Sequence, residues 1–211
     1  MKSLFRQSAI PAFLLIFTFI MLAGCKKDNP DKPKKNSFSY NSKESVIGFA
    51  IADIFGSTSQ DLYGVSLYFL ENTLQWPFET GASGNEAHIG DILFFTILVN
   101  DPVAIPLGTY SFNYDDGTLV NTLYGRGTEL MVNFNTGNGY TGTAINITGG
   151  KVVMLKTGEE YEIEMDFETD YNTKITGYYK GKIDNEDIPG KLKSDLMELR
   201  QTTEKTQSIL Y

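Results

Sequence analysis

From about Val46 onward, short apolar runs of strand length are separated by turn residues. Several runs alternate apolar with polar positions, as a strand with one buried face does, and glycine-containing turns join neighbouring runs. The pattern predicts an all-β domain, an antiparallel β-sandwich or β-barrel of about ten strands, with a C-terminal helix. The expected strands are residues 46–55, 63–70, 92–99, 109–114, 118–124, 129–135, 140–148, 151–157, 161–167 and 175–183.

Two hairpins are predicted in more detail. Asp115-Asp116-Gly117 is a strong turn signal, because Asp-Gly supplies the positive φ of tight turns, and it predicts that residues 118–124 return antiparallel along residues 109–114. In the last hairpin, an acidic strand face is followed by a basic one. If the turn centres near Tyr171, Glu162 lies opposite Lys180, so charge and apolar alternation specify the same register.

A helical pattern replaces the strand pattern after Pro189. Leu192, Leu196 and Leu199 recur at helix spacing, with charged residues elsewhere around the helix. Such a stripe either binds a partner or covers an open end or face of the sheet. We expect the second, because one leucine stripe needs only one surface to bury it. Residues 189–211 are therefore expected to form a helix and tail packed on a domain of residues 38–188.

The first residues have the features of an export signal. Lys2 and Arg6 precede an apolar run from Ala9 to Ala23, which is shorter than the about 20 residues of a membrane span. The run ends in Leu22-Ala23-Gly24-Cys25, which resembles the lipobox of bacterial lipoproteins. The resemblance implies that residues 1–24 are a signal peptide and that Cys25 receives a diacylglyceryl group. It also implies that the α-amine of Cys25, freed when the signal peptide is removed, is acylated with a fatty acid such as palmitate.

This resemblance implies a place in the cell. A lipid on Cys25 would hold the protein at the outer membrane, facing the periplasm or the outside, with the membrane as its first partner. Cys25 is the only cysteine, so lipidation leaves no thiol for catalysis, a zinc site or a disulfide. Residues 25–37 lack apolar side chains after the cysteine and contain two prolines, which predicts a flexible tether.

A second resemblance concerns the fold. Residues 146–153, 161–163 and 175–181 are similar to the closing hairpins of small, uncharacterised β-rich lipoproteins of anaerobic gut bacteria, some with calycin-like barrels. The likeness covers about forty residues. It consists of recurring Gly and Tyr residues and of alternating apolar and polar positions, so it bears on fold and source. A true lipocalin would carry Gly-x-Trp on its first strand, whereas Trp76 lies in Gln75-Trp76-Pro77.

The charge distribution argues against nucleic acid as a partner. The formal net charge is −8, and residues 36–211 hold 24 of the 26 acidic but only 11 of the 18 basic residues, which gives that part −13. Affinity for nucleic acid rests largely on Lys and Arg that neutralise phosphates. An acidic surface instead keeps the protein soluble and repels anionic surfaces.

No motif indicates catalysis or a resident metal. His88, the sole histidine, lies in a predicted loop without a nucleophile elbow, and the acidic pairs are explained by turns and by an outer strand face. Residues 170–174 resemble half of a calcium loop, but Lys174 stands where a third oxygen ligand is expected. We expect a protein that is not an enzyme, with no catalytic residue, no metal and no cofactor.

Aromatic side chains are the remaining candidates for ligand binding. Trp76 and Phe78, in a long loop, and the outward-facing Tyr178 could stack on sugar rings, although Trp76-Pro77-Phe78 could equally fold back to close the core. We therefore expect non-catalytic binding or scaffolding at the cell envelope, with a glycan or an envelope protein as partner. The alternatives are a carrier of small apolar ligands in a calycin-like barrel and, less favoured, a glycan-acting hydrolase with two carboxylates about 5–10 Å apart.

Overall fold

The structure is a computed structural model, which describes residues 34–57, 62–75, 88–113, 120–137 and 140–185. This part is all-β, as predicted, and contains no helix. The expected helix of residues 189–211, the signal peptide and Cys25 lie outside the described residues. The strands are β1 (Ser37–Tyr40), β2 (Lys43–Ser57), β3 (Tyr63–Glu71), β4 (Ile89–Val99), β5 (Gly108–Asn113), β6 (Thr122–Asn135), β7 (Thr141–Lys156), β8 (Tyr161–Thr169), β9 (Lys174–Gly181) and β10 (Asp184–Asn185).

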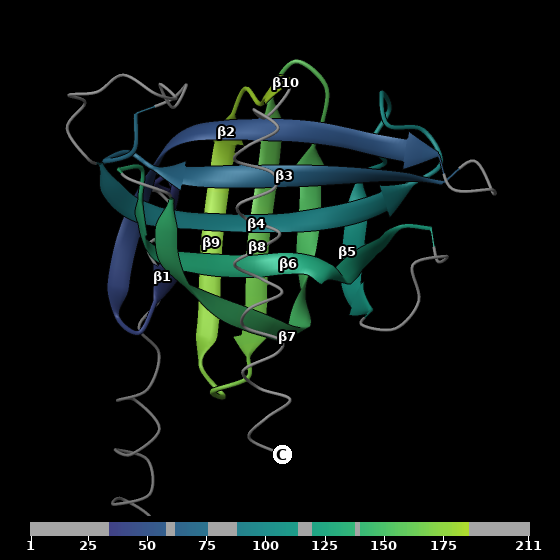
Figure 1. Cartoon of the computed structure of the whole chain (residues 1–211). Coiled ribbons are helices and arrows are strands. Elements are labelled where there is room, and N and C mark those ends of the chain that lie inside the picture. The colour runs from purple at the N-terminus through teal and green to yellow at the C-terminus, as the bar shows by residue number, and fades with distance from the viewer. Residues whose placement is uncertain (1–33, 58–61, 76–87, 114–119, 138–139, 186–211) are drawn as a thin grey trace, which may run out of the picture. The chain divides into compact units, whose positions relative to one another are not determined.

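The sheet closes into a barrel, which decides between the two architectures that the sequence allowed. Its strand order is β1-β9-β8-β7-β5-β6-β4-β3-β2-β10, and β1 also pairs with β2, so the ring from β1 to β9 has no open edge. The short β10 pairs with β2 outside this ring. In Figure 1, β2, β3, β4 and β6 run across one side of the barrel while β8 and β9 run steeply behind them.

The predicted antiparallel return of residues 118–124 along residues 109–114 is wrong. Ser111 of β5 lies opposite Thr122 of β6 in a parallel pair, and the antiparallel partner of β5 is β7, with Gly108 opposite Met154. β5 fills the gap where β6 and β7 diverge, because β6 pairs with β7 only from Glu129 onward. Strand partners this far apart in the chain leave no local sequence signal.

Bulges explain why four predicted strands are two long ones. Residues 122–135 form a single β6, in which a register shift against β4 falls between Tyr124 and Glu129. Residues 141–156 form a single β7, with a shift against β8 at Gly149. The glycines that indicated turns therefore bend the chain within the sheet and do not end the strands.

Gly150 makes the tightest of these bends. Its φ is +118°, and a Cβ there would lie 2.2 Å from the carbonyl oxygen of Asp166 and 2.6 Å from Cα of Phe167. Both atoms belong to the neighbouring backbone, which cannot turn aside as a flexible side chain can. Glycine is therefore required where β7 approaches β8.

Gly150→Ala is expected to lower the free energy of unfolding by about 3 kcal/mol, since backbone strain and steric crowding each cost about 1–3 kcal/mol. Gly158→Ala is the matched control, because Gly158 also has a positive φ, +109°, but has no atom within 4 Å of its would-be Cβ. Urea unfolding measures both variants. Equal losses would show that crowding between β7 and β8 contributes nothing.

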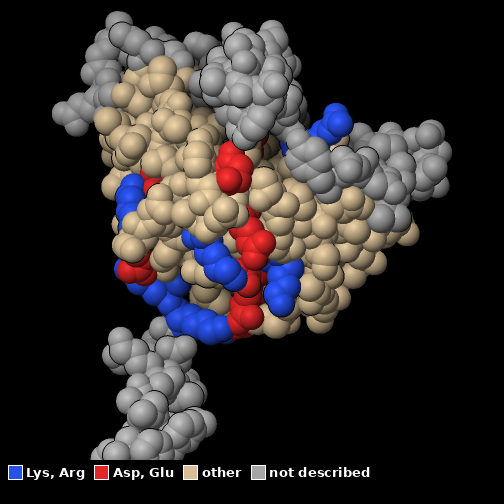
Figure 2. Space-filling model, turned by 90° about the horizontal axis from the view of Figure 1, so that it is seen from below, with Lys and Arg blue, Asp and Glu red and all other residues tan. Residues whose placement is uncertain are grey.

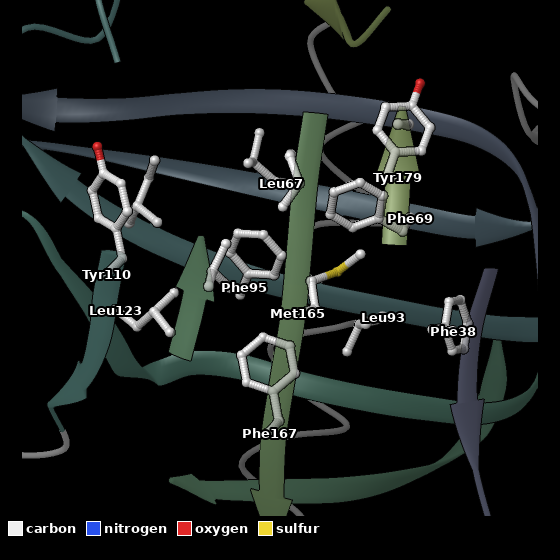
Figure 3. Packing of buried hydrophobic residues seen from close by; sticks show 14 of the residues in the cluster. Phe38, Leu67, Phe69, Leu93, Phe95, Tyr110, Leu123, Met165, Phe167 and Tyr179 are labelled. Carbon is white, nitrogen blue, oxygen red and sulfur yellow. The ribbon is translucent and has the colours of Figure 1, made fainter. Parts of the chain in front are cut away.

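The interior of the barrel is filled by side chains (Figure 3). Phe69 contacts Phe95 with ring centroids 5.6 Å apart and Tyr179 at 5.3 Å, and Phe95 contacts Phe167 at 5.8 Å. These aromatic rings come from strands on opposite sides of the barrel, and together they occupy its centre. Aliphatic side chains pack around them, among them Leu67, Leu93, Leu123, Val152, Met154, Ile163 and Met165.

A second apolar cluster lies on the outside of β2, β3, β4 and β6. Its members on these strands alternate with the interior residues and point away from the barrel axis, while Leu74 follows β3 and Tyr140 and Ala144 lie at the start of β7. We call it the outer apolar face. It consists of Ile51, Tyr68, Leu70, Leu74, Ile92, Phe94, Met131, Phe134, Tyr140 and Ala144.

The described body begins before the first strand. The Asn36 side-chain amide donates to the carbonyl of Lys180 and accepts from its N–H, each at 2.8 Å, while the Asn36 carbonyl accepts from Ile47 N–H at 3.0 Å. Asn36 thereby links β9 to β2 where β1 starts. Ser37, the last residue of the predicted tether, is the first residue of β1, and Phe38 is buried in the interior.

Candidate functional site

Tyr178 is the one candidate ligand-binding residue that the structure describes, and it lies on the outer surface of β9. The predicted register is confirmed: Glu162 of β8 lies opposite Lys180 of β9, and Tyr178 lies opposite Glu164. The alternate residues of both strands face the interior, where Ile163, Met165 and Phe167 are buried. Alternation therefore places the polar side chains of this hairpin together on the outside.

One carboxylate holds the Tyr178 side chain in place. The Tyr178 hydroxyl donates to Glu162 Oε1 at 2.8 Å, and Lys180 Nζ lies 3.3 Å from Glu162 Oε2. Burial, and then the hydrogen bond and charge of Glu162, raise the pKa of Tyr178 to about 12. The phenol therefore stays protonated at neutral pH, and its ring is fixed beside an acid and an amine.

The outer surface of the barrel carries both charges. On one face of the molecule, Figure 2 shows acidic side chains with basic ones on either side of them. The described ion pairs include Lys174–Asp166 at 3.9 Å and Lys156–Glu160 at 2.9 Å. These pairs are about half exposed, so each contributes only fractions of a kcal/mol to stability. Their donors and acceptors are available to a polar ligand.

The other predicted site residues lie outside the described ranges. Trp76 and Phe78 belong to residues 76–87, and Cys25 belongs to residues 1–33.

The weaker sequence candidates have structural roles where they are described. The backbone of His88 bonds to Thr136 through three hydrogen bonds, at 3.0, 2.9 and 3.4 Å, which join the start of β4 to the end of β6. Thr169 and Thr173 close the β8–β9 turn through their hydroxyls, 2.6 Å apart. Within the described ranges, no group of three His, Cys, Asp or Glu side chains is placed to hold a metal ion.

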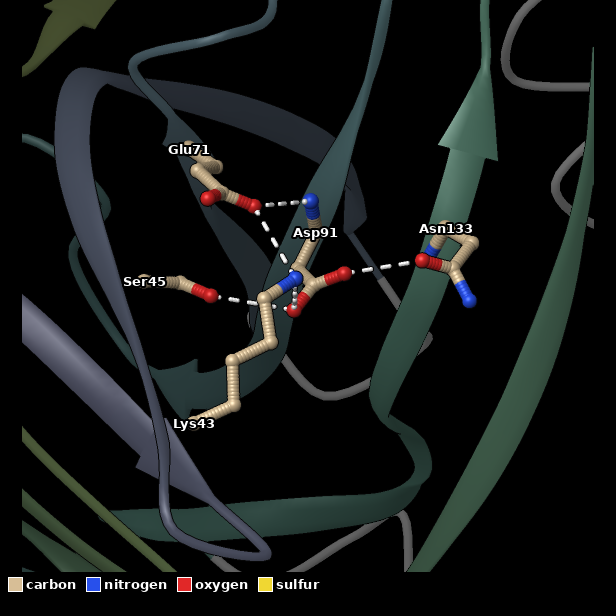
Figure 4. A network of polar contacts seen from close by, with 5 residues as sticks. All are labelled: Lys43, Ser45, Glu71, Asp91 and Asn133. Atoms are coloured by element: carbon tan, nitrogen blue, oxygen red, sulfur yellow. Dashed lines mark hydrogen bonds and ion pairs between the residues drawn. The ribbon is translucent and has the colours of Figure 1, made fainter.

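Sequence reasoning missed a polar network centred on Asp91 (Figure 4). Asp91 Oδ2 accepts hydrogen bonds from Lys43 Nζ at 2.7 Å and Ser45 Oγ at 3.0 Å, while Oδ1 accepts from Asn133 N–H at 2.9 Å. The Asp91 N–H donates to Glu71 Oε2 at 2.8 Å. The network therefore joins β2, β3, β4 and β6. Its sequence signal is a lone carboxylate at the head of the apolar run of β4.

The geometry of this network is that of a structural clamp. Asp91 is only 3% exposed and both of its oxygens already accept hydrogen bonds. Burial acts to lower the pKa of Lys43, but the hydrogen bond and charge of Asp91, followed by those of Glu71, outweigh it and raise that pKa. Lys43 thus remains a cation well above neutral pH and keeps its contacts with Asp91 and Glu71.

Buried tyrosines predict a loss of stability at alkaline pH. Burial raises the pKa of Tyr68, Tyr110 and Tyr179 from 10.0 to about 12, with the charge of Asp53 adding to the effect at Tyr68. A tyrosine whose pKa is raised by folding stabilises the native state fully below pH 10.0. This stabilisation is lost as the pH approaches 12. The urea midpoint should therefore be level from neutral pH to about 10 and then fall.

Tyrosinate absorbance, measured beside the urea midpoint, assigns this fall to ionisation. In Tyr68→Phe the decline should be shallower, because one of the raised groups is gone. If the urea midpoint begins to decrease at a pH well below 10, before any tyrosinate forms, the assignment is contradicted.

No family model, curated protein or solved structure matches the chain. Among the residues that the structure describes, no helix has the length and apolar character that a membrane span requires.

Proposed function

We propose that this protein is an outer-membrane lipoprotein, anchored through a diacylglyceryl group on Cys25, whose β-barrel is a non-catalytic binding or scaffolding domain for a glycan or an envelope protein. The lipobox Leu22-Ala23-Gly24-Cys25 supports the anchor. The chain between Cys25 and Asn36 serves as the tether. It leads to the described body at Lys35, whose amine lies 3.5 Å from Glu44.

The filled interior of the barrel carries the binding part of the proposal. A carrier of small apolar ligands needs an internal space, whereas Phe69, Phe95, Phe167 and Tyr179 occupy this centre in mutual contact. A partner is therefore met on the outside. This observation supports binding on the outer surface over the alternative of a small-ligand carrier.

The outer surface of β8 and β9 is the binding surface we favour. It combines the ring of Tyr178 with carboxylates and amines in fixed register, which suits a ligand with hydroxyls and an apolar ring face. An envelope protein with alternating charges would use the same groups.

Hydrolysis is less well supported. Glu71 and Asp91 both contact Lys43 Nζ, at 3.5 and 2.7 Å, and are therefore two neighbouring carboxylates, as glycoside hydrolysis requires. Asp91, however, is buried and both of its oxygens already accept hydrogen bonds, so its carboxylate does not face a substrate.

A binding panel tests the proposal. Residues 25–211 with Cys25→Ser are screened by thermal shift and Trp76 fluorescence against soluble oligosaccharides, saturated fatty acids and Ca²⁺. We expect a saturable shift with one oligosaccharide class, lost in Tyr178→Ala and kept in Thr176→Ala, which changes a neighbouring outward position on the same strand. Saturable binding of a fatty acid, or turnover of an oligosaccharide, would contradict the proposal.

An envelope-protein partner gives a different result. The panel then leaves both signals unchanged, and a photo-crosslinking residue at position 178 in cells captures one envelope protein that the same residue at position 176 captures less. Equal capture at both positions would contradict a role for the Tyr178 surface.

A further inference from the structure

The outer apolar face points away from the barrel and yet is shielded from water. Ile92 is 1% exposed, Phe94 8% and Met131 0%, although all three project outward. By contrast, the outward Leu155 of β7 is 46% exposed. A face that would expose this much apolar surface needs a cover.

The packing within this face is continuous across four strands. Tyr68 lies opposite Ile51 and Phe94, and its ring stacks on Phe94 with centroids 5.4 Å apart. In the next row, Ile92 lies opposite both Leu70 and Met131. The strands from β2 to β6 are spaced about 4.8 Å apart, so the face is roughly 14 Å wide.

The described chain ends at the edge of this face. Asp184 and Asn185 of β10 pair in parallel with Ile51 and Ala52 of β2, on the edge of β2 that does not pair with β3. Residues 186–211 follow directly. Ten helical residues, such as 191–200, are about 15 Å long and match the width of the face.

We propose that residues 186–211 cover the outer apolar face as an amphipathic helix, with Leu192, Leu196 and Leu199 packed against β2, β3, β4 and β6. Pro189 separates β10 from the helix, because proline is tolerated before or at a helix start but not inside it.

The first test compares two neighbouring apolar residues of the segment in residues 25–211 with Cys25→Ser. Leu196 belongs to the stripe, and Met197 points away from it. Leu196→Ser is expected to lower the urea midpoint, to increase binding of an apolar dye, and to bring the pKa of Tyr68 down from about 12, because Tyr68 loses its cover. Met197→Ser should change none of the three. Equal effects of the two variants, or none from either, would overturn the proposal.

A double-mutant cycle tests the contact if Leu196→Ser does not fold. Phe94 and Phe95 are adjacent in β4 but point outward and inward, respectively. The shifts in urea midpoint caused by Leu196→Ala and Phe94→Ala should not add, whereas those of Leu196→Ala and Phe95→Ala should. Additivity in both cycles would overturn the proposal.

Two other occupants would overturn it as well. If a second copy of the chain covers the face, the protein is a dimer and dye binding rises on dilution. If an apolar ligand covers it, the purified protein carries an extractable lipid whose removal increases dye binding. A monomer without bound lipid that binds dye only when Leu196 is changed supports the helix.

Discussion

Asp91→Ala is expected to lower the free energy of unfolding by about 2–3 kcal/mol. The substitution leaves the buried Ser45 hydroxyl without its acceptor, which costs about 1–3 kcal/mol, and it also removes the acceptor of the part-buried Asn133 N–H. Lys43 adds less, because its side chain is 49% exposed and can turn to water. Asn133 also has a positive φ of 53°, at a register shift of β6, and its bond to Asp91 holds that conformation.

The control for this prediction is Asp166→Ala, which removes an exposed partner 3.9 Å from Lys174 and should cost less than about 1 kcal/mol. Asp91→Asn should fall between the two, since it keeps an acceptor but loses the charge. Urea unfolding at neutral pH ranks the three. Comparable losses from Asp91→Ala and Asp166→Ala would contradict the clamp role of the network.

Cys25→Ala is expected to move almost all of the protein from the membrane fraction to the soluble fraction. Each buried acyl methylene contributes about 0.8 kcal/mol to membrane binding, and the proposed anchor has several chains on this one residue. Fractionation of cells and the mass of the intact membrane-extracted protein measure the effect, and the wild-type mass should exceed that of residues 25–211 by the acyl groups.

Lys26→Ala combined with Lys27→Ala provides the control, because it removes charge next to the lipid but leaves the lipobox intact. That variant should remain in the membrane fraction. Retention of Cys25→Ala with the membranes, or a wild-type mass without acyl groups, would rule out the proposed anchor.

The parts of the fold that could be predicted from the sequence are those determined by residues close together in the chain. In the β8–β9 hairpin, alternation and opposite charges on adjacent strands favour one register, and Glu162 does lie opposite Lys180. The all-β class follows from the same periodicity. The filled interior is likewise built from the inward residues of these alternating runs, such as Ile163, Met165 and Phe167.

Barrel closure could not be predicted, because it depends on short, distant pairings. β1 has four residues and only Phe38 is buried, so it carries no strand pattern, yet it joins β2 to β9. The Asp91 network is also nonlocal: Lys43, Asp91 and Asn133 share no motif and meet only when three strands align. Tyr178 was predictable as outward-facing, but its bond to Glu162 required the register.

The central claim is that a filled barrel meets its partner on the outside. Methyl NMR of residues 25–211 with Cys25→Ser and labelled methionines, titrated with a saturated fatty acid, tests it most directly. Met154 and Met165 lie in the interior at 1% and 3% exposure, and Met131 belongs to the outer apolar face. We expect the Met154 and Met165 methyl signals to stay unchanged throughout the titration. A saturable, stoichiometric shift of both would show an internal ligand site and contradict the account.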